Sequence, residues 1–185
     1  MKNLKIVTTT KFPFEWVSLE SYPDSKGVKV EIYLKNNDFE ATALKEMFRI
    51  LFSQIDAEIL IYQEHWGKFC LDTWNIKNDT YDYLGDDLSL LTKNYISMLL
   101  ESNIPLEYNG VCKCNDWSKF LSIILPCIDS GLAPYSPIIF STIHDLFFYF
   151  HYTGSIGLYY RKESNFIRDL IKKAELNFEV HLIHD

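Results

Sequence analysis

Alternating apolar and polar residues near position 30 predict a β-strand, and a helical stripe follows it. The apolar members of the strand lie two residues apart, at Val28, Val30, Ile32 and Leu34, as in a strand with one buried face. The next apolar residues have the spacing of one helix face, at Leu44, Met47, Phe48, Leu51 and Ile55. Between them lie residues typical of turns and helix N-caps, Asn36, Asn37 and Asp38. The apolar run 58–62 then predicts an inner strand, so residues 28–64 form a strand–helix–strand unit.

The C-terminal part of the chain has the same plan. Ile156, Leu158 and Tyr160 alternate with other residues and predict a strand. Ser164 is placed as the N-cap of a helix with an apolar stripe formed by Ile167, Leu170, Ile171 and Ala174. Phe178, Val180 and Leu182 then alternate through a last strand. We interpret the second unit as a common local solution reached twice rather than as an internal duplication.

The middle of the chain is predicted to be helical. Asp87 can cap one helix, with an apolar face of Leu88, Leu91, Tyr95, Met98 and Leu99. Asn115 can cap a second, with an apolar face of Trp117, Phe120, Leu121, Ile124 and Ile128. Pro126 should kink or end that second helix early, because proline lacks the backbone N–H.

Residues 146–152 are apolar or aromatic on both faces, which predicts a strand covered on both sides near the centre of a sheet. The turn Thr153-Gly154-Ser155 then leads into the strand at Ile156. Together the elements predict one α+β (mixed α/β) domain spanning residues 1–185. We expect a central sheet with helices on both faces and two strand–helix–strand units that flank the helical middle. The polar stretch 75–87 is expected to be an exposed loop rather than a linker.

Charge narrows the choice of partner. The chain has 18 Lys and Arg against 25 Asp and Glu, a formal net charge of −7. This balance argues against direct nucleic-acid binding, because phosphate contacts need clustered basic residues. It suits a basic protein partner, although acidity also serves solubility alone. The N-terminus lacks the apolar core of a signal peptide, and the apolar-rich stretch 120–132 is too short to cross a membrane. A soluble, cytoplasmic protein is therefore expected.

Metal ions and cofactors are not expected. Cys112 and Cys114 form a C-x-C pair, whereas zinc sites usually space cysteines further apart and need a second pair. His181 and His184 are three residues apart, so strand alternation would direct their side chains to opposite faces. The aspartates of 79–87 lack the glycine position and following glutamate of a calcium loop.

Three histidine regions are the candidates for catalysis. Known phosphate-binding, dinucleotide-binding, hydrolase and zinc-protease motifs are absent. A histidine beside a carboxylate, as in His144-Asp145, can act as a general base, but an ordinary capping or loop role is the preferred interpretation of this pair. His151 lies within the aromatic strand and His65-Trp66 ends the strand that begins at Glu58. A hydrogen-bonded core histidine is the ordinary interpretation of His151.

A stretch rich in acidic and aromatic residues is the candidate binding site. Its members are Asp79, Tyr81, Asp82, Tyr83, Asp86 and Asp87. The same pairing recurs at Glu107-Tyr108 and Asp116-Trp117. Tyrosine and tryptophan are favoured at protein contacts, and carboxylates steer a basic partner. The alternative is a solvated loop with a helix N-cap. Adjacency of the loops in space would give one acidic patch with aromatic anchors.

The chain resembles the small immunity proteins that protect bacteria from polymorphic toxins, including those of contact-dependent growth inhibition. The resemblance lies in its size, acidity, aromatic-rich α+β character and lack of a catalytic motif. The segment 147–157 is also similar to central hairpins of that group. The group has no common motif, so no site residue is carried over. The resemblance implies a cytoplasmic protein that occludes the active site of a cognate toxin domain, often a nuclease with a basic cleft.

Two other hypotheses remain open from the sequence. One is a small cytosolic enzyme or ligand-binding protein, which a pocket holding two of the histidines beside a carboxylate would favour. The other is an adaptor that pairs strands at an open sheet edge, with the hairpin at 153–155 as the expected location. The oligomeric state is not indicated.

Overall fold

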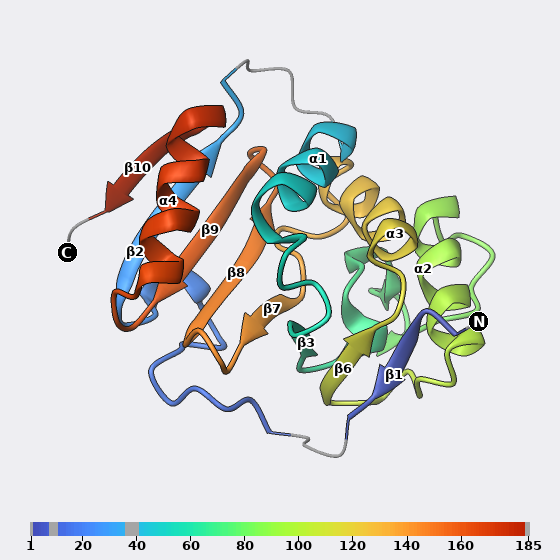
Figure 1. Ribbon diagram of the computed structural model, residues 1–185. Coiled ribbons are helices and arrows are strands. Elements are labelled where there is room, and N and C mark those ends of the chain that lie inside the picture. The colour runs from blue at the N-terminus through green and yellow to red at the C-terminus, as the bar shows by residue number, and fades with distance from the viewer. Residues whose placement is uncertain (1, 8–10, 36–40, 184–185) are drawn as a thin grey trace.

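An eight-stranded antiparallel sheet forms the centre of the computed structural model (Figure 1). The structure describes residues 2–7, 11–35 and 41–183. The strand order is β1-β6-β3-β7-β8-β9-β2-β10. The strands are β1 (Leu4–Ile6), β2 (Val28–Tyr33), β3 (Leu60–Gln63), β6 (Gly110–Cys114), β7 (Ile138–Ser141), β8 (Leu146–His151), β9 (Ser155–Tyr160) and β10 (Glu179–Ile183). A separate two-stranded sheet pairs β4 (Trp74–Asn75) with β5 (Thr80–Tyr81).

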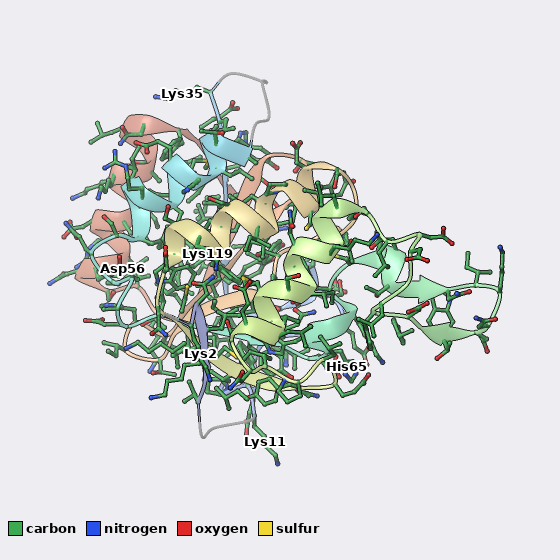
Figure 2. The ribbon with its side chains drawn as sticks, turned by 90° about the vertical axis from the view of Figure 1, so that its right-hand side faces the viewer. Lys2, Lys11, Lys35, Asp56, His65 and Lys119 are labelled. Atoms are coloured by element: carbon green, nitrogen blue, oxygen red, sulfur yellow. The ribbon has the colours of Figure 1, made fainter. Side chains whose placement is uncertain are left out.

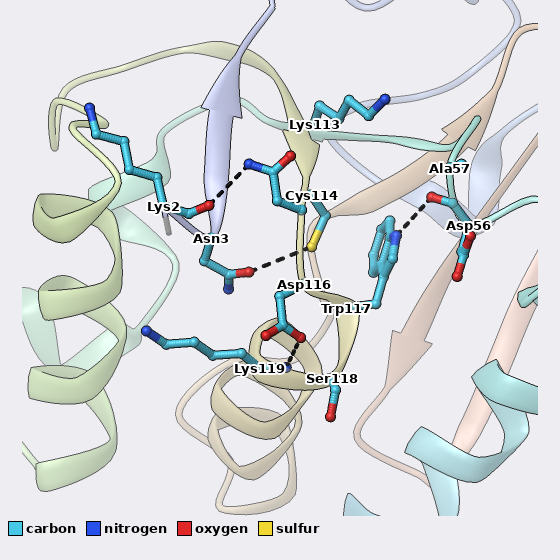
Figure 3. A pocket seen from close by; sticks show the side chains of 11 residues that line it. Lys2, Asn3, Asp56, Ala57, Lys113, Cys114, Asp116, Trp117, Ser118 and Lys119 are labelled. Atoms are coloured by element: carbon cyan, nitrogen blue, oxygen red, sulfur yellow. Dashed lines mark hydrogen bonds between the residues drawn. The ribbon is translucent and has the colours of Figure 1, made fainter.

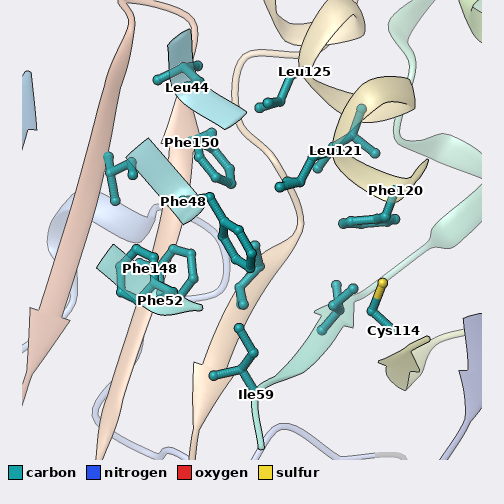
Figure 4. Packing of buried hydrophobic residues seen from close by; sticks show 14 of the residues in the cluster. Leu44, Phe48, Phe52, Ile59, Cys114, Phe120, Leu121, Leu125, Phe148 and Phe150 are labelled. Carbon is teal, nitrogen blue, oxygen red and sulfur yellow. The ribbon is translucent and has the colours of Figure 1, made fainter. Parts of the chain in front are cut away.

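The described residues form four α-helices on one face of the large sheet: α1 (Ala41–Phe52), α2 (Leu90–Glu101), α3 (Trp117–Asp129) and α4 (Asn165–Asn177). Alternation along β8 directs Leu146, Phe148 and Phe150 into the core beneath these helices. The rings of Phe52 on α1 and Phe148 stack at 3.8 Å between centroids (Figure 4). The α+β single-domain prediction is confirmed, and β8 is central, as expected, with β7 and β9 as neighbours.

The opposite face of the sheet is covered by the N-terminal segment 12–22. The predicted placement of helices on both faces is therefore wrong. Trp16 of the segment contacts Phe147, and Tyr22 contacts Tyr149. Phe12 and Phe14 both contact Phe140 on the same face. The segment is irregular except for one 3-10 turn, Tyr22–Asp24. Large aromatic rings cover apolar surface without a helical repeat, which is why the hydrophobic periodicity did not reveal this layer.

The two predicted strand–helix–strand units are present as elements, but their strands are not neighbours. In the first unit β2 and β3 are separated by β7, β8 and β9. In the second, β2 lies between β9 and β10 and pairs antiparallel with both. The helical middle also contributes β6 and β7 to the sheet, and the expected loop 75–87 overlaps the β4–β5 hairpin, which begins at Trp74.

Two helix starts differ from the prediction by one or two residues. Ser89 rather than Asp87 caps α2, and its hydroxyl accepts the N–H of Thr92. Asp116 rather than Asn115 caps α3. Ser164 caps α4 as expected. The predicted caps Asn36, Asn37 and Asp38 lie outside the described residues, as does His184.

Pro126 lies within α3, which continues to Asp129. Of the two effects expected of Pro126, a kink or an early end, the early end is therefore wrong. Buried side chains on both sides of the proline, including Ile124 and Ile128, hold the last turn against the core. In the described part of the chain, none of the helices combines the length and apolar character required to cross a bilayer.

Candidate partner-binding surface

The β4–β5 hairpin projects from the body of the molecule (Figure 2). Trp74 pairs with Tyr81, and Asn75 pairs with Thr80. The side-chain oxygen of Asn75 accepts the backbone N–H groups of Lys77 and Asn78, so that it closes the turn. Asp79 follows with a φ of 51°, in the left-handed region that Asp and Asn tolerate better than most residues. Asp79 is thus an exposed turn residue.

Exposed apolar side chains concentrate on this hairpin and its flanks. Six of the thirteen large apolar side chains exposed in the described residues fall within 71–90: Leu71, Trp74, Ile76, Tyr81, Leu84 and Leu90. Ile76 and Leu84 are 85% and 83% exposed. The rings of Trp74 and Tyr81 meet edge to face at 4.8 Å, and Tyr81 stacks on Tyr83. We call residues 71–90 together with Glu107 the hairpin surface.

The aspartates of the hairpin surface have different roles. Asp86 and Asp87 are exposed, and neither carboxylate has a hydrogen bond or ion pair among the described residues. The carboxylate of Asp82 accepts the N–H of Leu84 at 3.0 Å and therefore shapes the loop. Asp79, Asp86 and Asp87 are consequently the carboxylates free to meet a partner.

Tyr83 connects the hairpin to the predicted Glu107-Tyr108 segment. Its hydroxyl donates to the Glu107 carboxylate at 3.0 Å. Burial and then this hydrogen bond raise the pKa of Tyr83 to about 12. Gly67 permits Leu106 and Tyr83 to lie close to the backbone, because a side chain at this position would meet the carbonyl oxygen of Leu106 and the ring of Tyr83. The two acidic-aromatic segments therefore form one surface.

Two predicted aromatic anchors point into the protein instead. The hydroxyl of Tyr108 donates to the carbonyl of Val111 at 3.0 Å. The indole N–H of Trp117 donates to the carbonyl of Asp56 at 2.8 Å, and its ring packs against Phe48. Both side chains are half-buried against the main core. They contribute to the fold, which leaves little of either ring for a partner.

Asp116 and Trp117 are also remote from the hairpin surface. They follow β6, whereas Glu107 and Tyr108 precede it, and five strand residues span roughly 17 Å. Asp116 and Trp117 line a separate cleft of about 560 Å³ beside the start of α3 (Figure 3). Lys2, Lys113 and Lys119 also line it. The structure therefore does not gather all the predicted residues into one patch.

The sequence did not predict that Trp74 and Ile76 of this region would be contact residues. Trp74 occurs next to polar residues without an apolar repeat, and Ile76 is a single aliphatic residue in a polar stretch. A usable signal was the presence of large apolar residues where a solvated loop needs none. Lys68 adds one positive charge, with its ammonium group 4.3 Å from the centre of the Tyr81 ring.

The candidate catalytic histidines lie in three separate places. His144 stacks on Phe166 and lies 3.7 Å from the Glu58 carboxylate, while Asp145 occupies the β7–β8 turn. His65 lines a 280 Å³ pocket with Glu64 and Tyr81. His151 lines a 150 Å³ pocket with Glu31. Burial lowers the pKa of His151. The Glu31 carboxylate opposes this shift, and the Lys29 ammonium group adds to it. Each of these two pockets contains a single histidine.

The four cysteines are buried, and none of them forms a disulfide bond. Burial raises the pKa of the Cys112 and Cys114 thiols to about 12, which disfavours the thiolate that a metal or a nucleophile requires. Among the described residues, no three His, Cys, Asp or Glu side chains are grouped to hold a metal ion.

A scan against protein-family models and searches of curated proteins and of solved structures found no match to this chain.

Proposed function

We propose that this chain is an immunity protein that binds a cognate toxin domain and occludes its active site. The hairpin surface is the proposed contact region. The observation that carries the proposal is the concentration of exposed apolar and acidic side chains on one projecting element.

Burial of the hairpin's apolar side chains provides the proposed affinity. Contiguous exposed apolar side chains are unfavourable in water, and in soluble proteins such groups often mark interaction sites. Trp74 is the strongest candidate for a central contact, because tryptophan is enriched among residues whose truncation costs roughly 2 kcal/mol or more. Tyr81 contacts the Trp74 ring, and Tyr83 in turn stacks on Tyr81. These ring contacts already restrict the three side chains, so that binding has less conformational freedom to remove.

Charge provides the proposed orientation. Asp79, Asp86 and Asp87 are exposed on the same hairpin surface as the apolar side chains, and the chain as a whole carries −7. Carboxylates at the rim of an interface accelerate encounter with a basic partner. A nuclease-type toxin with a basic cleft is the class of partner that this arrangement fits.

The competing hypotheses gain less support. The enzyme hypothesis called for two histidines and a carboxylate in one pocket, whereas His65, His144 and His151 lie apart. The adaptor hypothesis located its strand edge at 153–155. That turn joins β8 to β9 in the middle of the sheet, where both strands have neighbours on either side.

A growth assay tests the proposal. The toxin domain to be used is the C-terminal domain of the secreted protein that the proposed function predicts in the adjoining reading frame, and it is expressed together with this chain in bacteria. We expect wild-type protein to restore growth and Trp74→Ala/Ile76→Ser to lose most of that protection. Ile143→Ser is the matched control, because Ile143 is 68% exposed and lies away from the hairpin.

Equal expression and equal melting temperatures of the variants ensure that only binding is compared. Failure of the wild-type protein to protect would reject the immunity function. Full protection by the hairpin variant would reject the hairpin as the contact surface.

A further inference from the structure

The strand β10 forms an open edge of the large sheet. It pairs with β2 on one side, and no strand of the described residues pairs with its other side (Figure 1). The unpaired N–H and C=O groups of such an edge can accept another strand. The open sheet edge that the adaptor hypothesis expected at 153–155 is therefore found at β10.

The two edges of the sheet differ in how well they resist pairing. The opposite edge strand, β1, has three residues and carries the exposed Lys5 at its centre. Short length and lysine are common means of blocking edge pairing. The β10 strand has five residues without lysine or proline, and Leu182 is 47% exposed. The β10 edge therefore lacks three of the usual protections, namely short length, lysine and proline, although it carries the exposed Glu179.

The pattern of β10 is complementary to itself in an antiparallel arrangement. Val180 and Leu182 lie opposite Ile32 and Val30 of β2, so they belong to the face that the helices cover. Glu179 and His181 lie on the other face, where they already pair at 2.8 Å within one chain. If Val180 faces its own copy, Glu179 of each chain faces His181 of the other, and Leu182 faces Phe178.

We propose that the partner of β10 is a second copy of this chain, paired antiparallel about Val180. The pairing joins two sheets into one and extends the apolar row of Phe178, Val180 and Leu182 across the dimer axis. The carboxylate–imidazole pairs form twice, because a two-fold interface repeats every contact. The inference is independent of the hairpin surface, which lies on other strands.

Sedimentation equilibrium over a wide concentration range tests the dimer. We expect the wild-type mass to rise toward twice that of one chain, and Leu182→Lys to raise the dissociation constant about tenfold or more. Ile143→Lys, at an exposed apolar position outside the strand, is expected to leave the constant unchanged. A monomer at every concentration, or equal effects of the two variants, would overturn the proposal.

Cross-linking tests the register and does not depend on Leu182. Val180→Cys should form a disulfide-linked dimer on mild oxidation with diamide, because residues directly opposite in an antiparallel pair have Cβ atoms about 5 Å apart. Lys5→Cys on the β1 edge is the control and should remain monomeric. The native cysteines are buried. Cross-linking of Lys5→Cys but not of Val180→Cys would reject β10 as the interface.

Discussion

Asp72 shows how a single carboxylate can support the hairpin surface without forming part of its contact area. Its two oxygens accept the N–H of Ser89 at 3.0 Å and the hydroxyl of Thr92 at 2.6 Å. Ser89 caps α2, so Asp72 fixes the start of that helix to the base of the hairpin. Because negative charge is favourable at a helix N-terminus, both the hydrogen bonds and the charge stabilise this junction.

Replacement of Asp72 by alanine should destabilise the protein. We expect the free energy of unfolding to fall by about 1–3 kcal/mol, because two partly buried donors lose their acceptor. Urea denaturation measures the change. Asp86→Ala is the matched control, since the Asp86 carboxylate has no contact of this kind among the described residues, and it should shift stability by less than about 0.5 kcal/mol. Equal effects of the two substitutions would contradict the role given to Asp72.

Glu31 makes a second residue-scale prediction, which concerns pH. Burial raises its pKa, but hydrogen bonds from Lys29 and Tyr33 outweigh burial and hold the pKa below the usual value of 4.5. A lowered folded-state pKa stabilises the protein above the unfolded value, and this contribution disappears as the pH falls through the folded value.

The stability advantage of wild type over Glu31→Gln should therefore shrink between pH 6 and pH 3. Denaturation curves at several pH values measure it. A difference that stays constant with pH, or grows on acidification, would contradict this role of Glu31.

At the residue scale, the sequence predicted which residue types would cap helices better than it predicted their positions or contacts. Asp87 and Asn115 were reasonable caps by residue type, yet Ser89 and Asp116 occupy the cap positions. Neighbouring Asp, Asn and Ser residues all favour helix starts, so their local preferences cannot separate them. Tyr108 and Trp117 were predicted to be anchors because the sequence gives no sign of hydrogen bonds to Val111 and Asp56.

At the scale of elements, the hairpin is held by its base rather than by its own strands. Two paired residues on each strand form too small a sheet to be stable alone. The base is fixed by the 3-10 turns η2 (Trp66–Lys68) and η3 (Leu71–Thr73): η2 contacts the segment that precedes β6, and the N–H of Leu71 in η3 donates to the carbonyl of Leu132. The N–H groups of Trp66 and Gly67 donate to the carbonyls of Tyr108 and Leu106.

Gly67 is the most sensitive position of this base. A Cβ atom there would lie 2.7 Å from the carbonyl oxygen of Leu106 and 3.0 Å from the ring of Tyr83. Gly67→Ala should lower the free energy of unfolding by about 1–3 kcal/mol and increase amide hydrogen exchange around Leu106. Gly85→Ala is the control, because the added methyl meets the flexible side chain of Asp82. Unchanged stability of Gly67→Ala would show that the segment can move aside.

The elements with clear periodicity were predictable, and their arrangement was not. The β2 and α1 segments were found from repeats of two and of three to four residues. Their strand neighbours depend on contacts between residues far apart in sequence, such as Val28 with Tyr160. Alternation carries no information about which strand lies alongside.

At the scale of the whole molecule, two aromatic layers enclose the sheet. The helices cover one face, and the N-terminal segment covers the other with Phe12, Phe14 and Trp16. This arrangement leaves the projecting hairpin as the main concentration of exposed apolar side chains in the described residues. The aromatic content of 16% is thus divided between the core and a surface.

The exposed carboxylates of the hairpin surface should control the rate of partner association. Asp87→Lys is expected to slow association with a basic toxin domain severalfold at low salt and much less at high salt, because mobile ions screen steering. Stopped-flow measurements over a range of ionic strength provide the rates. Asp24→Lys, which alters an exposed carboxylate outside the hairpin surface by the same charge, is the control. Identical behaviour of both variants would assign the effect to net charge alone.

The dissociation constant of the purified complex tests the central claim most directly. Binding of the toxin domain is measured for wild type, Trp74→Ala and Ile143→Ala under identical conditions. The account predicts a constant about 30-fold higher for Trp74→Ala, which corresponds to roughly 2 kcal/mol, and no change for Ile143→Ala. An unchanged constant for Trp74→Ala in a correctly folded protein would contradict the hairpin as the binding surface.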